Sequence, residues 1–232
     1  MHNFNLIWRM LRRDWRSGEL TVVGLAIVLA VAALTGVGFL TDRVAQGLKL
    51  EAHQLLGGDL LLTADHPWAA DYSVEAAARG LRVAQSATFP SMVQTEGANG
   101  LATQLAEIKA VSESYPLRGT LRIAPGLNTQ DEKTQVVPRV GEAWPDERLA
   151  TALRLSKGSR LALGNANVNI DAILTLEPDR GTNLLALAPR LMINLADLPA
   201  TGLIQPGSRV NYRLHLAGEP RAVAGFSEWA KA

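Results

Sequence analysis

The sequence has 232 residues, no cysteine and a formal net charge of +1, and 47% of its residues are hydrophobic. The balanced charge excludes a nucleic-acid-binding surface built on bulk positive charge. The lack of cysteine excludes disulfides, cysteine zinc sites and thiol nucleophiles, and the length is enough for one or two domains with apolar cores.

The first segment, residues 1–19, has the pattern of an amphipathic helix. Its apolar residues recur at helical spacing on one face, whereas its four arginines lie largely off that face. The residues of this stripe are Phe4, Ile7, Trp8, Leu11 and Trp15. Tryptophan and arginine in this arrangement are typical of a helix in the membrane interface, so we expect this helix on the cytoplasmic surface.

Residues 20–40 contain no charge and predict a permanent transmembrane helix. Twenty-one helical residues extend about 31 Å, close to the hydrocarbon thickness of a bilayer. A cleaved signal peptide is the main alternative, because Ala30-Val31-Ala32 resembles a cleavage site, but the apolar run continues well beyond it. A buried core helix would have a polar face, which this segment lacks.

Basic residues predict the orientation of this helix. Four arginines precede the span, compared with Arg43 and Lys49 in a similar window after it. The positive-inside rule therefore places the N-terminus in the cytoplasm and the larger part of the chain outside.

Residues 41–57 continue the helical pattern and predict a stalk. Val44, Leu48 and Leu55 recur at helical spacing, and Gly57 and Gly58 end the pattern. We interpret these two glycines as a possible hinge where the chain enters the next domain.

Residues 58–232 predict a mixed α and β extracytoplasmic domain. Its signals are a strand at 59–65, a helix capped by Ser73, a long hairpin at 82–112 and a helix capped by Asp146. A hairpin is predicted at 159–179, and Val210, Tyr212, Leu214 and Leu216 predict a strand with one buried face. Another helix begins near Ala232, so we expect a truncated chain that ends before a further span.

Motifs that carry chemistry are absent from the sequence. It contains no P-loop, dinucleotide fingerprint, zincin motif or nucleophile elbow. The four histidines, His2, His53, His66 and His215, lack metal-ligand spacing. The sequence therefore predicts no catalytic residue, metal or cofactor, and no enzymatic activity in this chain.

Two charged stretches are weak candidates for contacts with a partner. In "LEPDRGTN" the charged residues are Glu177, Asp179 and Arg180, and we interpret the stretch as a solvated turn with a local ion pair. In "YPLRG", Arg118 either bonds backbone carbonyls at a bend or faces a partner.

Several stretches together resemble the FtsX/MacB-type ABC-transporter permeases, in the large YbbP-like branch. They are "LGGDLLL", "YPLRGTLRI", "RLATALRLSKGSRLALGNANVNIDAILTLEPDRG" and "LAPRLMINLADLPATGLIQPGSRVNYRLHL", and the resemblance covers nearly the whole chain as an N-terminal portion. It implies a MacB-like periplasmic core domain, the bacterial inner membrane, further spans and a separate cytoplasmic ATPase. It also implies mechanotransmission: movement passes along the stalk to a domain that handles lipid, lipoprotein or other hydrophobic substrates. A lysophospholipase or esterase is the periplasmic partner that it implies.

Two other functions fit the residues alone. One is a single-span anchored binding or scaffold protein that acts through protein contacts. The other is a cleaved, extracytoplasmic enzyme whose site the sequence does not reveal.

Overall fold

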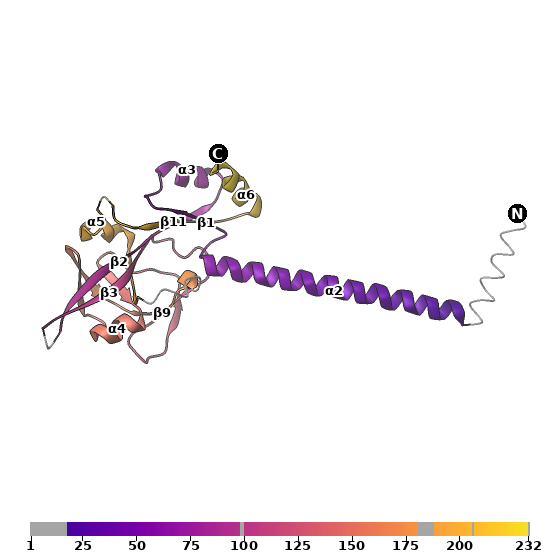
Figure 1. The fold of residues 1–232 in the computed structure, drawn as a ribbon, viewed down its shortest axis with the longest axis horizontal. Coiled ribbons are helices and arrows are strands. Elements are labelled where there is room, and N and C mark those ends of the chain that lie inside the picture. Colours follow the sequence, from indigo (N-terminus) through magenta and orange to yellow (C-terminus); the bar gives the residue numbers. More distant parts are fainter. Residues whose placement is uncertain (1–17, 98–99, 181–187, 206, 232) are drawn as a thin grey trace, which may run out of the picture. The chain divides into compact units, whose positions relative to one another are not determined.

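The structure, a computed structural model, describes residues 18–97, 100–180, 188–205 and 207–231. It divides into two compact units, residues 1–50 and 51–232, which are described separately. The amphipathic helix predicted for residues 1–19 lies outside the described residues, apart from its last two positions. Element labels follow Figure 1.

One long helix, α2 (Glu19–Leu56), covers both the predicted span and the predicted stalk. Its 38 residues correspond to about 57 Å of helix. Within it, Thr21–Gly47 is long and apolar enough to cross a membrane, with a mean hydropathy of 2.5, and its side chains are all exposed. This exposure argues against a buried core helix. The helix ends before Gly57, whose φ of +66° suits a residue without a side chain.

A closed ring of six strands forms the centre of the domain. Pairing of β2 with β7 closes the ring β2-β3-β10-β6-β8-β7, so these strands have fewer free edges. They are β2 (Arg82–Gly97), β3 (Gly100–Val111), β6 (Glu142–Pro145), β7 (Arg160–Leu163), β8 (Ala166–Ile170) and β10 (Arg190–Asn194). Alternate apolar residues of the ring fill the main core, including Phe89, Ile108, Leu161, Ile170 and Leu191. The predicted 82–112 hairpin is present as β2–β3.

Two further strands extend the sheet beyond β2. They are β1 (Leu60–Ala64) and β11 (Asn211–Ala217), paired antiparallel. Figure 1 shows α3 (Ala70–Ala78) and α6 (Pro220–Trp229) side by side over them, and Leu214 and Leu216 pack with Phe226 beneath these helices. The predicted cap at Ser73 is wrong, because α3 starts three residues earlier.

The remaining elements form a smaller sheet and short helices. The sheet consists of β4 (Leu121–Ala124), β5 (Glu132–Thr134) and β9 (Ile173–Leu176). The helices are α4 (Glu147–Leu153), η1 (Pro178–Arg180), η2 (Leu195–Asp197) and α5 (Leu198–Thr201). Asp146 caps α4 as predicted, accepting a hydrogen bond from the Leu149 amide. The predicted 159–179 hairpin is only partly right: β7 and β8 pair, but β9 joins the smaller sheet.

Strand β11 departs from the predicted pattern. Val210, Leu214 and Leu216 are buried as expected, but His215 on the opposite face is also fully buried. The prediction of a single buried face is therefore wrong for the second half of this strand. A histidine inside a domain needs hydrogen-bond partners, and His215 finds one at the end of α2 and one on β2.

Candidate functional site: a buried ion network at the end of the long helix

The chain leaves α2 through residues 56–59, called here the helix exit. Backbone hydrogen bonds fix this segment to the domain. The Gly57 carbonyl accepts from the amides of Leu117 and Arg118, at 3.1 and 3.2 Å, and the Asp59 amide donates to the Leu216 carbonyl at 2.8 Å. The helix exit is thus tied to both the 115–118 segment and β11.

Both glycines of the helix exit lie against other residues. A Cβ added at Gly57 would meet the rings of His215 and Tyr115 at 3.5–3.6 Å, on a backbone that disfavours any side chain. A Cβ at Gly58 would lie 3.0 Å from the Leu216 carbonyl oxygen. The glycines therefore allow close packing at this point, and a hinge here stays a prediction.

Arg118 holds the helix exit from the side. Its guanidinium donates two hydrogen bonds to the Asp59 carboxylate, at 2.9 and 2.7 Å. The same carboxylate accepts from the Gly218 amide at 3.0 Å. Arg118 thus binds a carboxylate instead of the backbone carbonyls that were one of its two expected roles. Its side chain is 41% exposed, and the other expected role, a contact with a partner, stays a prediction.

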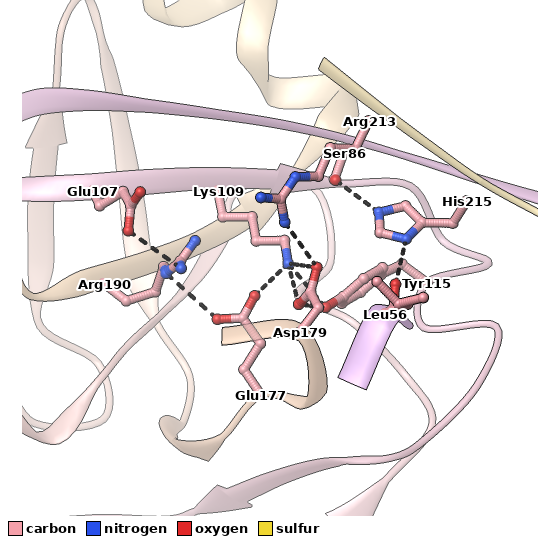
Figure 2. Close-up of polar contacts among 10 residues, drawn as sticks. All are labelled: Leu56, Ser86, Glu107, Lys109, Tyr115, Glu177, Asp179, Arg190, Arg213 and His215. Carbon is pink, nitrogen blue, oxygen red and sulfur yellow. Dashed lines mark hydrogen bonds and ion pairs between the residues drawn. The ribbon is translucent and has the colours of Figure 1, made fainter. Parts of the chain in front are cut away.

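His215 links the last residue of α2 to the sheet (Figure 2). Its Nδ1 lies 3.1 Å from the Leu56 carbonyl oxygen and its Nε2 lies 3.0 Å from the Ser86 hydroxyl. Because a carbonyl can only accept, Nδ1 carries the proton and Nε2 accepts from Ser86. Burial lowers the pKa of His215 to about 4, against the opposing attraction of Asp179. The ring is therefore neutral at pH 7.

Lys109 is fully buried and lies at the centre of an ion network (Figure 2). Its ammonium group donates to Glu177, to both oxygens of Asp179 at 2.6 and 2.8 Å, and to the Tyr115 hydroxyl at 2.9 Å. Glu177 and Asp179 are only 6% and 5% exposed. The expectation of a solvated turn with a local ion pair is wrong, since both carboxylates point inward to a lysine about 70 positions away. For the same reason they cannot form a surface contact with a partner.

Two arginines and one more carboxylate complete the ion network. Arg190 lies 3.2 Å from Glu107 and 3.4 Å from Glu177, and Arg213 lies 3.5 Å from Asp179. The members are Lys109, Arg190, Arg213, Glu107, Glu177 and Asp179, so the positive and negative charges balance. Such a balance is needed where charges leave water.

Asp179 and Tyr115 have shifted pKa values for opposite reasons. Burial raises the pKa of Asp179, but the charge of Lys109 and hydrogen bonds from Lys109 and Tyr115 outweigh it, so the pKa is below its usual value. Burial, reinforced by Asp179 and Glu177, raises the pKa of Tyr115 well above its usual value. Asp179 is therefore charged and Tyr115 neutral, and the hydroxyl donates to the carboxylate.

Arg180 points away from the ion network toward α4. Its guanidinium donates to Asp146 Oδ2 at 2.7 Å, while Asp146 Oδ1 accepts from the Leu149 amide at 2.8 Å. Arg180 therefore supports the capping residue of α4. The local ion pair expected within its own turn is replaced by a contact 34 positions away.

The structure thus brings together most of the residues that the sequence singled out. The helix exit with Gly57 and Gly58, the Arg118 segment and the turn with Glu177 and Asp179 form one continuous set of contacts. Sequence reasoning missed Lys109, Tyr115 and His215. The available signal was two charged residues, Glu107 and Lys109, within the otherwise apolar stretch "AEIKAV".

The arrangement is suited to holding segments together rather than to catalysis. The Ser86–His215 pair has the geometry of a nucleophile and a base, but these residues are only 2% and 0% exposed. Among the described residues, no group of three or more His, Asp or Glu side chains could hold a metal ion. The end of α2 is therefore fixed to the domain by backbone hydrogen bonds and by the neutral His215, and the ion network lies next to it through Tyr115.

Comparison with known proteins gives one clear relative. The chain is 36% identical over 225 residues, 97% of its length, to a protein of Escherichia coli (strain K12) described as an uncharacterized ABC transporter permease, YbbP. The predicted resemblance to a YbbP-like permease is confirmed. The chain spans about a quarter, 26%, of that relative, and no family model matches it.

Two solved structures show a weaker likeness, both at 11% identity. The periplasmic region of MacB from Actinobacillus actinomycetemcomitans aligns with a TM-score of 0.46, covering 79% of this chain and 87% of that one. A domain of a putative permease from Porphyromonas gingivalis aligns with a TM-score of 0.39, covering 65% and 69%.

Proposed function

We propose that this chain is the part of an ABC transporter permease that contains one span, its stalk and an extracytoplasmic domain. The observation that carries the proposal is the 36% identity to YbbP over nearly the whole chain. The permease would lie in the bacterial inner membrane with its N-terminus in the cytoplasm and this domain in the periplasm. It would act with a separate cytoplasmic ATPase subunit, as the family resemblance implies, and the absence of a P-loop from this sequence is consistent with that.

The proposed mechanism is mechanotransmission, in which α2 carries movement between the cytoplasmic side and the outer domain. A continuous 38-residue helix supports this role, since a helix without a break can pass on a tilt or shift. The hydrogen bonds at the helix exit also support it, because they connect the end of α2 directly to β11 and the 115–118 segment. Gly57 and Gly58 would be the point at which the movement enters the domain.

The substrate class in this proposal follows from the family resemblance. It is a lipid, lipoprotein or other hydrophobic molecule at the outer face of the inner membrane. A periplasmic lysophospholipase or esterase would be a further partner.

The test uses the full permease that contains this chain, assembled with its ATPase in lipid nanodiscs. Gln46 lies in the exposed part of α2, and Gln46→Pro would remove a backbone hydrogen bond and kink the helix. Gln46→Ala is the matched control, because it keeps the helix. The measurement is hydrogen exchange of residues 56–59 and 115–118 in ADP-bound and ATP-bound complexes.

We expect an ATP-dependent change in exchange for the unaltered permease and for Gln46→Ala, and a loss of that change for Gln46→Pro with the ATPase still bound. A permease that binds no ATPase would refute the transporter proposal and favour an anchored scaffold protein. An ATP-dependent change that survives Gln46→Pro would instead refute transmission through an unbroken α2.

A further inference from the structure

We propose that residues 177–180, called here the charged turn, form a coupling element between the helix exit and the N-terminus of α4. Its use in transport rests on the proposed function, but the coupling itself is a property of this chain. Glu177 and Asp179 share Lys109 of β3, and Asp179 also accepts from Tyr115 (Figure 2). Arg180 binds Asp146 at the start of α4, so the charged turn contacts three parts of the domain, and this observation leads to the proposal.

One side of the charged turn reaches the helix exit. Asp179 accepts a hydrogen bond from the Tyr115 hydroxyl. Tyr115 precedes Leu117 and Arg118, whose amides bind the Gly57 carbonyl. The Tyr115 ring also contacts His215 edge-on, with 5.4 Å between ring centroids. Through the Tyr115 side chain, Asp179 is therefore next to the 115–118 segment, which binds Gly57, and to His215, which binds Leu56.

The other side of the charged turn reaches α4. Arg180 binds Asp146, and Asp146 caps the helix through the Leu149 amide. The Asp146 amide in turn donates to the Arg190 carbonyl at 2.8 Å. A shift of Arg180 would therefore change the position of the capping carboxylate and weaken the first turn of α4.

Burial makes the charged turn respond as a unit. Asp179 cannot move away from Lys109 without the rest of the turn, because the buried ammonium would lose one of its two carboxylates and its charge would be unbalanced. Glu177 is held in the same way by Lys109 and Arg190. Movement at Tyr115 is thus transmitted along the turn to Arg180 instead of being absorbed by a local side-chain shift.

Hydrogen exchange on this 232-residue chain in nanodiscs, without any ATPase, tests the coupling. Tyr115→Phe removes the hydroxyl at one end and Arg180→Gln removes the guanidinium at the other. Arg122→Gln is the control, because it breaks an ion pair with Asp131 that lies outside this set of contacts.

We expect Tyr115→Phe to speed exchange of the Leu149 and Ala150 amides about fivefold or more, although the Tyr115 hydroxyl bonds Lys109 and Asp179 and not α4. Arg180→Gln should likewise speed exchange of the Leu117 and Arg118 amides. The amides of Leu161 and Leu163 in the closed ring of strands should change little in either variant, and Arg122→Gln should change none of these.

The proposal fails if each substitution affects only the residues it contacts. It also fails if exchange rises equally in the closed ring of strands, because the effect is then general destabilisation. The same effect in Arg122→Gln would contradict it as well. Because no ATPase is present, failure here would leave the transporter proposal standing, and failure of the transporter test would leave this coupling standing.

Discussion

At the scale of single residues, Lys109 decides whether the buried site is stable. Its ammonium group donates to two carboxylates and to a neutral tyrosine, so it has no spare donor. In a buried network the loss of one partner costs more than the intact network contributes, because the remaining charges have no water to replace it.

Lys109→Met should therefore destabilise the domain strongly. Glu177 and Asp179 would remain buried without their shared cation, and we expect the free energy of unfolding to fall by about 3–5 kcal/mol. Urea unfolding of the chain in detergent micelles, followed by tryptophan fluorescence, measures this change. Arg122→Gln, which breaks a partly exposed ion pair, should change the unfolding midpoint little. A similar midpoint for both variants would contradict the role of Lys109.

His215 predicts a pH dependence with a defined sign. Its pKa in the folded domain is about 4, below the value of about 6.5 for an unfolded histidine. Between these values the unfolded chain binds the proton and the folded chain does not, so stability falls as the pH is lowered from about 6.5 to 4. The slope from one such group is at most about 1.4 kcal/mol per pH unit.

His215→Asn should remove this contribution, because its amide can still donate to the Leu56 carbonyl but does not titrate. The measurement is the free energy of unfolding at several pH values between 4 and 7. The variant should show a shallower pH dependence than the unaltered chain. Identical slopes would show that His215 does not carry the predicted linkage.

At the scale of elements, the sequence predicts best what local signals determine. The long apolar run, the glycines after it and Asp146 before "ERLATAL" identify α2, its end and the start of α4. The β2–β3 hairpin follows from two apolar runs around a glycine-rich turn. Closure of the ring of strands by β2 and β7 depends on residues about 70 positions apart, and no local signal predicts it.

Of the candidate site, only the residues in turns could be predicted from the sequence. Gly57, Gly58, Arg118 and the charged turn are visible because glycine and charge mark exposed loops on average. This general tendency gave the wrong interpretation for Glu177 and Asp179. Their partner Lys109 lies in β3, a strand whose sequence is mostly apolar. Burial of a charge depends on a partner brought by the tertiary fold, so sequence patterns alone do not reveal it.

At the scale of the whole molecule, the span and the domain together predict which side of the membrane each part faces. The sequence has no cysteine, so a single introduced cysteine reports its own location. Glu113→Cys lies on an exposed turn of the domain, and His2→Cys lies at the N-terminus. Neither position is part of the ion network.

We expect a membrane-impermeant maleimide to label Glu113→Cys in cells with a permeabilised outer membrane, because the positive-inside rule places the domain in the periplasm. His2→Cys should react only after the inner membrane is opened. The mass of the purified chain distinguishes the remaining alternative, since removal of the apolar segment as a signal peptide would give a product starting near Ala33. Labelling of His2→Cys but not Glu113→Cys in intact inner membranes would reverse the orientation. It would also move the helix exit to the cytoplasmic side, where α2 could not carry movement to an outer domain.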